Sequence, residues 1–225
     1  MMDREAEAAK ALRLSEFKAL QAQINPHFLY NSLDMINWLA RAGELEQVSE
    51  GIQALGRFYK LTLSKKDTMG TVDKETEHAA LYVKLQNMRY ENRIRFVVDI
   101  DENIQSCVMP KLVFQPLVEN AILHGIMERE DKQGDLLLAG WRDGDDLVFL
   151  LSDNGVGMTE EQIERIMRPD ASAAQSAGKA GTNIGIYNTH ERLQLYYGSQ
   201  YGLTYESTPG AGTDVYIRIP FSPEP

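Results

Sequence analysis

The chain carries four groups of residues whose types and spacing could support chemistry. In the first, Asp153 follows an apolar, strand-like run at 147–152 and opens the sequence DNGVGM. A carboxylate held at the end of a strand can accept a hydrogen bond from an exocyclic amine, and Gly155 and Gly157 let the backbone approach a ligand closely. The same letters also fit a glycine-rich turn with an Asp cap, so this motif alone leaves both interpretations open.

A second group lies on a predicted helix that Pro110 opens and that continues through Ile122. Asn120 and His124 are four residues apart and therefore share one face of this helix. An amide oxygen suits Mg²⁺, a hard cation that prefers oxygen ligands, and the ion would bridge to phosphate oxygens with His124 near the same cluster. The alternative is an ordinary solvated helix face with a surface histidine.

Glycines in the C-terminal part form a third group. The sequence GTNIGIYN at 181–188 runs into a predicted helix at 186–197. The free N–H groups at a helix N-terminus favour anions such as phosphate, and Gly185 would allow close approach there; a simple helix-start turn is the alternative. Gly212 and Thr213 precede the last predicted strand, where a tight hairpin turn would explain them equally well.

The fourth group is the sequence QINPHFLYN at 23–31. Pro26 lies inside a helical pattern, where it removes one amide donor and clashes with the carbonyl of Ala22, so a kink is predicted. A kink would leave His27 accessible, and histidine is the natural neutral nitrogen nucleophile near pH 7. A core histidine within a helix bundle is the alternative.

Two amphipathic helices must position His27. Apolar residues recur at helical spacing between residues 17 and 39 and again between 48 and 59, and Gly43 suits a left-handed cap between them. Two helices joined by a short turn predict an antiparallel hairpin. Because neither helix can bury its apolar stripe alone, we expect the hairpin to pair with a second copy as a dimeric four-helix bundle.

Beyond a polar break at 64–72, the pattern changes to that of an α+β module. The expected helices are 73–90, 110–122, 160–167 and 186–197. The expected strands are 93–100, 136–141, 147–152, 201–207 and 213–220. The small, polar and non-periodic residues 168–184 predict a mobile loop or lid.

Composition sets further limits. The 225 residues carry 23 basic and 33 acidic side chains, a net charge of −10, without a strong basic patch, which argues against nucleic-acid binding. The single cysteine, Cys107, excludes an intramolecular disulfide and a cysteine-based zinc site. No stretch approaches the roughly 18 apolar residues of a membrane span, so we expect no membrane contact by these residues.

Taken in order, the motifs resemble those of LytS-type (YesM-like) sensor histidine kinases, whose ATP-binding module is a Bergerat-fold (GHKL) ATPase. The matching sequences are LQAQINPHFLYNSLD at 20–34, PLVENAILHG at 116–125, DNGVGM at 153–158 and NIGIYN at 183–188. The resemblance covers about residues 15 to 220. It implies a dimerising, histidine-bearing hairpin at 1–70 and a catalytic ATP-binding domain, a Bergerat-fold α/β sandwich, at 71–225.

The resemblance implies a role for each matching residue. His27 would accept the phosphoryl group, Asn120 would hold Mg²⁺ against the phosphates of ATP, and Asp153 would pair with the adenine amine. The other implied nucleotide contacts are Gly155, Gly157, His124, Lys179, Gly185, Gly212 and Thr213. This fold lacks a Walker A loop, so the absence of that motif is expected.

The implied activity is that of an ATP-dependent protein histidine kinase. The phosphoryl group would pass from ATP to an imidazole nitrogen of His27 and then to an aspartate on the receiver domain of a response regulator. In commoner histidine kinases an acidic residue follows the histidine, whereas Phe28 follows here, which leaves the general base open. Asn31, one turn away, could orient the ring, and Glu119 is the candidate base from the ATP module.

Two other classes remain as alternatives. One is a Bergerat ATPase that drives a clamp, and the other is a nucleotide-binding dimerisation module without kinase activity. The presence of His27, Asn120 and Asp153 together favours the kinase. The resemblance further implies that the natural protein continues upstream into a membrane-bound sensor, with these residues on the cytoplasmic side.

Overall fold

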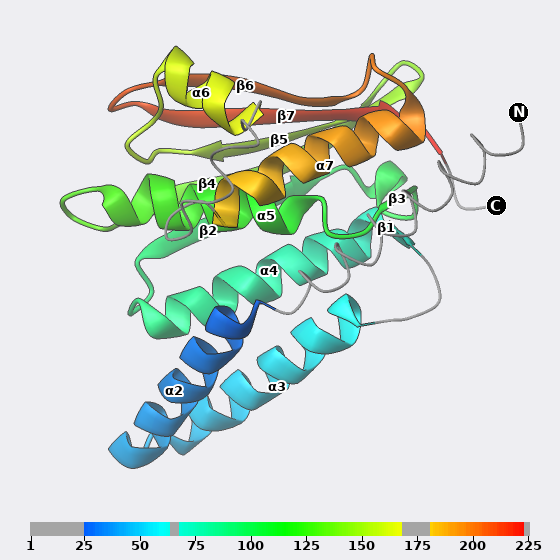
Figure 1. Ribbon diagram of the computed structural model, residues 1–225. Helices are drawn as coiled ribbons and strands as arrows, with labels where there is room; N and C mark the ends of the chain where they lie inside the picture. Colours follow the sequence, from blue (N-terminus) through cyan, green and yellow to red (C-terminus); the bar gives the residue numbers. More distant parts are fainter. Residues whose placement is uncertain (1–24, 64–67, 168–180, 223–225) are drawn as a thin grey trace, which may run out of the picture. The chain divides into compact units, whose positions relative to one another are not determined.

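The computed structural model describes residues 25–63, 68–167 and 181–222, and the chain forms two compact units that divide between Lys65 and Lys66. The first unit contains a helical hairpin, and the second combines helices with a mixed sheet (Figure 1). These helices and strands confirm the expected α+β class. Residues 69–71, near the sequence-based boundary at residue 70, form a strand of the second unit.

In the hairpin, α2 (Pro26–Ala42) begins at its proline. Asn25 has an extended backbone, and its side-chain oxygen accepts a hydrogen bond from the Phe28 amide at 3.2 Å. Pro26 occupies the first helical position, where a missing N–H costs little because that donor has no partner within the helix. Within the described residues, the Asn25-Pro26 pair starts a helix; the helix predicted before it lies outside them, so the kink stays a prediction.

The hairpin turns at Gly43, whose φ of 84° is left-handed, and continues as α3 (Leu45–Thr62). The Gly43 amide donates to the carbonyl of Ala40, which closes the last turn of α2. The rings of Phe28 and Phe58 lie 5.0 Å apart between the two helices. The other buried apolar residues of the hairpin are Met35, Ile36, Leu39, Ala54 and Leu55. The predicted antiparallel hairpin is confirmed.

Five strands build the main sheet of the second unit in the order β2-β4-β5-β7-β6. Their bounds are β2 (Ile94–Ile100), β4 (Gly134–Asp143), β5 (Asp146–Asp153), β6 (Gly202–Thr208) and β7 (Gly212–Pro220). β2 runs parallel to β4, and the remaining neighbours are antiparallel. All five predicted strands are confirmed to within two residues at each end.

Helices α4 (Val72–Arg89), α5 (Phe114–Asn120) and α7 (Gly181–Tyr197) lie on one side of this sheet (Figure 1). Alternate residues of β5 face them, so that Leu147, Phe149 and Leu151 are buried. The Phe149 ring meets Phe114 of α5 at 5.1 Å between centroids. The short helix α6 (Glu160–Met167), confirmed as predicted, adjoins α7.

A second, two-stranded sheet pairs β1 (Met69–Thr71) with β3 (Val108–Pro110). Pro110, predicted to open a helix, is the last residue of β3, and the prediction is wrong there. The strand end tolerates a residue without an N–H, and α5 starts four residues later, at Phe114. Between them, Leu112 adopts a left-handed φ of 58°.

Two further boundaries differ from the sequence-based expectation. After Asn120 the helix changes its hydrogen bonding to a π-helix, η2 (Ala121–Gly125), and then to a 3₁₀ turn, η3 (Ile126–Glu128); another 3₁₀ turn, η1 (Glu102–Ile104), follows β2. α7 already includes residues 181–184, which were predicted as loop. No helix in the described part of the chain combines the length and apolar character needed to cross a membrane.

Candidate functional site

The first candidate site centres on Asp153, the last residue of β5. Its side chain is 8% exposed, and Oδ1 accepts a hydrogen bond from the Gly155 amide at 2.8 Å. Burial raises the pKa of Asp153 from 3.8 to about 6, against the bonds from the Gly155 and Thr213 amides, and the negative charge of Asp214 adds to the rise. A carboxyl group with this environment fits a ligand that supplies a hydrogen-bond donor.

The glycines after Asp153 allow three distant segments to meet. A Cβ atom on Gly155 would overlap the backbone of Gly125, and one on Gly157, whose φ is +67°, would overlap the carbonyl of Thr208. The Val156 amide donates to the Gly125 carbonyl at 3.2 Å. Only glycine fits these close approaches, so Gly155 and Gly157 shape the loop beside Asp153.

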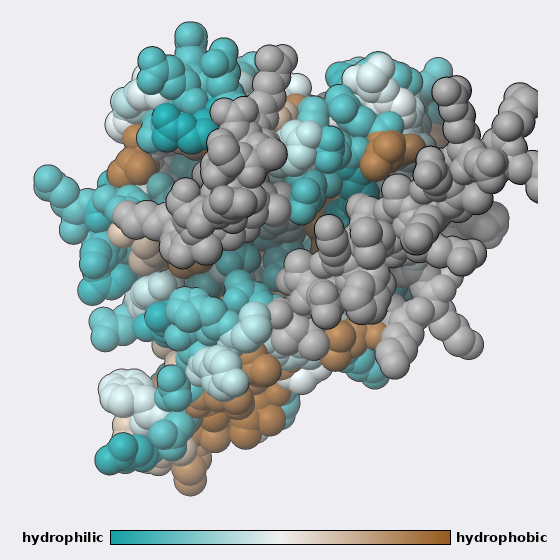
Figure 2. Space-filling model, in the orientation of Figure 1, coloured by the Kyte–Doolittle hydropathy of each residue, from teal (hydrophilic) through white to brown (hydrophobic). Residues whose placement is uncertain are grey.

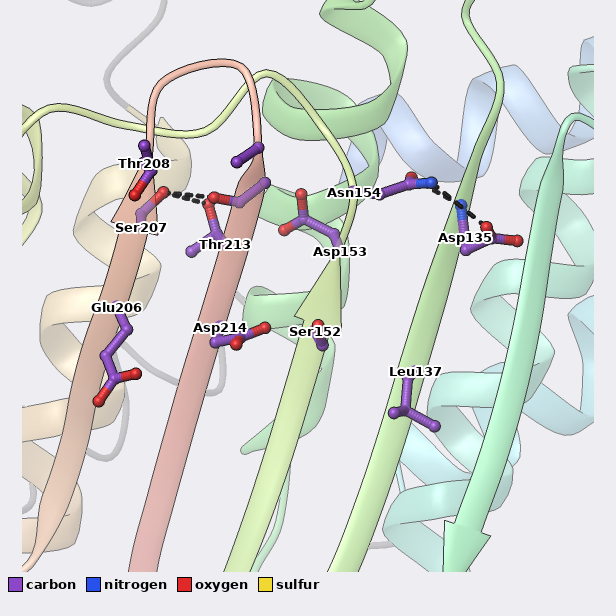
Figure 3. Close-up of a pocket in the computed structure, with 12 residues that line it drawn as sticks. Asp135, Leu137, Ser152, Asp153, Asn154, Glu206, Ser207, Thr208, Thr213 and Asp214 are labelled. Carbon is purple, nitrogen blue, oxygen red and sulfur yellow. Dashed lines mark hydrogen bonds between the residues drawn. The ribbon is translucent and has the colours of Figure 1, made fainter.

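The turn between β6 and β7 closes the other side of Asp153, as Figure 3 shows. Ser207 donates to the Gly212 carbonyl at 2.7 Å and lies 2.9 Å from the hydroxyl of Thr213. Its Oγ also accepts a hydrogen bond from the Met158 amide at 2.8 Å. The sequence analysis did not single out Ser207, because its neighbours become adjacent only when the two strands pair.

A surface hollow of about 400 Å³ includes Asp153, Gly212 and Thr213. Its other lining residues are Asp135, Leu137, Ser152, Asn154, Glu206, Ser207, Thr208, Ala211 and Asp214. Strand alternation places residues 137, 152 and 214 on the sheet face opposite to Asp153, so most of the hollow lies away from the helices. We therefore locate the candidate site by Asp153 and the glycine contacts, and not by the centre of the hollow.

Asn154, the residue that follows Asp153, holds the chain in place beside it through hydrogen bonds. No sequence motif indicated this role. Its Oδ1 accepts from the Asp135 amide at 2.8 Å, and its Nδ2 donates to the Asp135 carboxylate at 3.2 Å. The Asn154 carbonyl accepts from Arg129 at 2.6 Å, and Asp131 holds the same guanidinium at 3.0 Å. These hydrogen bonds join residues that are 19 and 25 positions apart, so the spacing of polar residues in the sequence could not predict them.

Helix α5 and the π-helix bring the second predicted group toward Asp153. Gly125, the last residue of the π-helix, is so close that an added Cβ would lie 2.9 Å from Asp153 Oδ1. Glu119 and Asn120 are partly buried on α5, whereas His124 is exposed. A π-helix is rare and is frequent at functional sites, and here it directly follows Asn120.

Gly185 lies on α7 beside the same helix. A Cβ atom added to Gly185 would lie 3.5 Å from Pro116 Cβ, in ordinary contact. Pro116 is one turn before Asn120, so α7 adjoins the face of α5 that carries the amide. The predicted phosphate contact Lys179 lies outside the described residues.

The second candidate site is His27, in the first turn of α2. Its ring is exposed, and the Asn31 amide nitrogen lies 3.2 Å from each of the two ring nitrogens. The amide can donate to whichever ring nitrogen carries no proton, so the roles of the two nitrogens depend on the tautomer. The structure thus places Asn31 against the ring of His27, in the first unit of the chain.

Metal binding at the first site would depend on few protein ligands. Among the described residues, there is no group of three or more His, Cys, Asp or Glu side chains arranged to hold a metal ion. Mg²⁺ keeps several waters and is often bound by one or two protein ligands together with substrate phosphates. One amide such as Asn120 therefore fits a cation that arrives with a nucleotide.

Comparison with known proteins gives consistent matches. The model of the family described as "Histidine kinase" matches residues 15–94, and that of "Histidine kinase-, DNA gyrase B-, and HSP90-like ATPase" matches residues 108–223. The solved catalytic domain of histidine kinase ThkA aligns at a TM-score of 0.51 and 18% identity, over 69% of this chain and 95% of that domain. This structural likeness concerns the fold.

Two curated relatives cover almost the whole chain. Sensor histidine kinase YesM of Bacillus subtilis (strain 168) is 35% identical over 220 residues, which are 98% of this chain and 36% of YesM. Sensor protein LytS of Bacillus anthracis is 30% identical over 213 residues, 94% of this chain and 35% of LytS. The chain therefore spans about a third of the length of these relatives. Because the second family model matches more than half of the chain, the protein belongs to the histidine kinase-, DNA gyrase B- and HSP90-like ATPase family.

Proposed function

We propose that the protein is the kinase core of a two-component sensor: it phosphorylates its own His27 from Mg-ATP and passes the phosphoryl group to an aspartate of a response regulator. The observation that carries this proposal is the exposed His27 ring with Asn31 at 3.2 Å, in a chain of this ATPase family. An ATPase without a phosphoacceptor would need no such residue. The similarity to YesM and LytS supports the same activity.

In the proposed nucleotide site, Asp153 accepts a hydrogen bond from the exocyclic amine of adenine. Gly155, Gly157, Gly212 and Thr213 shape the surroundings of the base, because each lies next to Asp153 or its loop. Buried polar groups of this kind discriminate strongly, since a base without the matching donor leaves the carboxyl unpaired. The site is therefore expected to prefer adenine over guanine.

The phosphate end of the proposed site lies between α5 and α7. Asn120 would contribute an oxygen ligand to Mg²⁺, which neutralises phosphate charge when bound. His124, Gly185 and Lys179 are the remaining proposed phosphate contacts. The partial burial of Asn120 restricts its rotamers, which favours a fixed ligand position.

At His27, the unprotonated ring nitrogen would attack the γ-phosphorus of ATP. The bond from phosphorus to the β,γ-bridging oxygen breaks, a phosphorus–nitrogen bond forms, and ADP leaves. The ring then carries a positive charge, which it loses with the proton of its second nitrogen. Asn31 would orient the ring, and Glu119 is the proposed base from the ATP-binding unit.

We also propose that the hairpin forms a homodimer. Its described surface exposes large apolar and aromatic side chains that a lone hairpin would leave in water. These residues are Tyr30, Leu33, Trp38, Leu45, Ile52 and Leu63. Figure 2 shows a group of brown, hydrophobic side chains on this part of the molecule. A four-helix bundle would cover part of this surface, and we propose that a response regulator receiver domain docks at the exposed His27. By analogy with its relatives, we place the unit on the cytoplasmic side of a membrane sensor.

The test is incubation with Mg²⁺ and γ-labelled ATP, followed by acid and alkali treatment of the labelled protein. We expect acid-labile, alkali-stable label in the wild type and none in His27→Gln. Asn37→Ala, at an exposed position of the same helix, is the matched control and should label normally. Label that survives in His27→Gln would overturn the site assignment, and ATP hydrolysis without any label would favour an ATPase.

A further inference from the structure

One peptide group in the second unit is held at both ends by oppositely charged side chains. The N–H of Val113 donates to Glu75 Oε2 at 3.0 Å. The carbonyl of Leu112, in the same peptide group, accepts from Arg192 Nη2 at 3.0 Å. Because N–H and C=O point in opposite directions across a trans peptide, Glu75 of α4 and Arg192 of α7 approach it from opposite sides.

This peptide occupies a strained position. Leu112 has a φ of 58°, a left-handed conformation that a leucine rarely adopts. The peptide ends at Val113, the N-cap residue of α5, which starts at Phe114. Such a conformation persists when its surroundings over-determine it, and the two charged side chains supply that constraint. The contacts therefore fix where α5 begins and in which direction it leaves β3.

Glu75 is removed from water, and Arg192 is partly buried. Glu75 is 5% exposed. Burial raises the pKa of Glu75, while the amides of residues 112 and 113 and the charge of Arg192 act against the rise. Burial lowers the pKa of Arg192, against the attraction of Glu75, and its Nε has no hydrogen-bond partner among the described residues. Each charge thus depends on the other, and removing one leaves its partner poorly compensated.

The held peptide is connected to the candidate phosphate end by helices α5 and α7. Arg192 is two turns after Gly185 on α7, so both residues face the same side of that helix. Gly185 adjoins Pro116 of α5, one turn before Asn120. α7 therefore meets α5 at Pro116 through Gly185 and meets the peptide just before α5 through Arg192. Two contacts of this kind set the relative position of the helices.

We propose that Glu75 and Arg192 are a positioning pair that holds α5 and α7 in the register needed for Mg-nucleotide, with Asn120 on one helix and Gly185 on the other. This inference rests on the proposed function of the site. Neither side chain needs to touch the nucleotide, because both act through the peptide before α5. The pair should therefore matter for the phosphate and metal end, and less for the base end at Asp153.

The experiment measures the affinity for a non-hydrolysable ATP analogue by calorimetry, once with Mg²⁺ and once with EDTA. The dissociation constant in EDTA divided by the dissociation constant with Mg²⁺ reports the metal-dependent part of binding. We expect Arg192→Met to lower this ratio about tenfold, as losses of groups that orient metal ligands do. The affinity in EDTA should change little. Arg192→Lys, which keeps a donor for Leu112, should retain part of the ratio.

Arg218→Met is the matched control, because Arg218 forms hydrogen-bonded ion pairs with Asp143 and Asp146 but is 45% exposed. It should leave the ratio unchanged. Should Arg192→Met fail to fold, Glu75→Gln combined with Arg192→Gln removes both buried charges while keeping polar groups at the peptide, and a reduced ratio is again expected.

The outcomes separate the two claims. If the wild type binds the analogue and the folded variants keep its ratio, the positioning role is overturned while the proposed function stands. Equal weakening with Mg²⁺ and with EDTA would also overturn it, because that pattern indicates general disturbance of the fold. Absence of analogue binding by the wild type would overturn the proposed function and this inference together.

Discussion

At the scale of single residues, burial of the Asp153 carboxylate costs stability but suits it to accept a hydrogen bond from a ligand. Its carboxyl is buried at a strand end, where it accepts the Gly155 amide and faces the negative charge of Asp214. Burial disfavours the charged form, so the pKa rises to about 6. A residue selected for stability alone would not be a carboxylate here. Functional sites commonly retain such groups, since a ligand supplies the missing donor.

This reasoning predicts opposite effects of Asp153→Asn on stability and on binding. The amide can still accept the Gly155 N–H but carries no charge, so unfolding at pH 7 should cost about 1–3 kcal/mol more than in the wild type. The second carboxylate oxygen becomes an NH₂ donor facing the donor of adenine. Nucleotide affinity should therefore fall at least about tenfold. Urea unfolding and calorimetric titration measure the two quantities.

The sign of the pH dependence provides the control. The folded pKa of Asp153, about 6, lies above its ordinary value of 3.8, so the folded state binds this proton more tightly. The stabilisation that comes from this tighter proton binding is fully present below pH 3.8 and is lost as the pH rises through 6. The difference in stability between variant and wild type should grow across that window. A constant difference from pH 4 to 7 would contradict the assigned pKa.

At the scale of elements, a substitution in the hairpin turn can show how much backbone conformation alone contributes to the stability of the hairpin. Gly43 has a φ of 84° and open space around its Cα, so Gly43→Ala adds strain but no clash. We expect it to destabilise the hairpin by about 1 kcal/mol, and Gly43→Asn by less. Trp38 fluorescence in a Trp141→Phe background reports unfolding of α2, at one fixed protein concentration.

The same substitution at a second glycine should have the opposite sign. Gly56 lies exposed within α3, and an added Cβ would also meet no atom of the described residues within 4 Å. There the alanine favours the helix, so Gly56→Ala should stabilise by about 0.5–1 kcal/mol. Destabilisation by both variants would show that the hairpin responds to something other than local backbone preference.

Elements with a regular pattern could be predicted from sequence. Alternation in β5 and helical spacing in α2 depend on burial of one face, and burial repeats along the chain. Local hydrogen bonding does not repeat in this way. The π-helix after Asn120 and the helix start at Pro26 depend on single contacts, such as the Asn25 cap and the approach of Gly125 to Asp153. Periodicity carries no information on these.

For the candidate site, sequence motifs named residues whose types fit the chemistry, and the structure adds what holds them. Asp153 and Asn120 were recognised because their motifs, taken in order with the others, resemble those of a known family. Arg129 and Ser207 were missed, since their partners Asn154 and Thr213 are brought near only by folding. Contacts between distant segments can be predicted only when the strand order and pairing are known, and sequence motifs do not provide these.

At the scale of the whole molecule, the exposed apolar surface of the hairpin bears on the proposed assembly. Trp38 of α2 is 67% exposed and Ile52 of α3 is 56% exposed. Burial of such side chains contributes roughly 1.5–3 kcal/mol each, which is enough to drive association when several act together. A single exposed residue needs no explanation, whereas six large ones on one hairpin do.

We therefore predict that Trp38→Glu and Ile52→Glu each weaken dimerisation by about tenfold or more, because each places a charge in an apolar interface. Sedimentation equilibrium across micromolar concentrations gives the dissociation constant. Leu195→Glu on α7 is the matched control: Leu195 is 74% exposed but lies in the second unit, so the dimer should persist. An unchanged constant in both hairpin variants, or a monomeric Leu195→Glu, would place the interface elsewhere. Loss of labelling at His27 together with the dimer would indicate that phosphorylation requires the dimer.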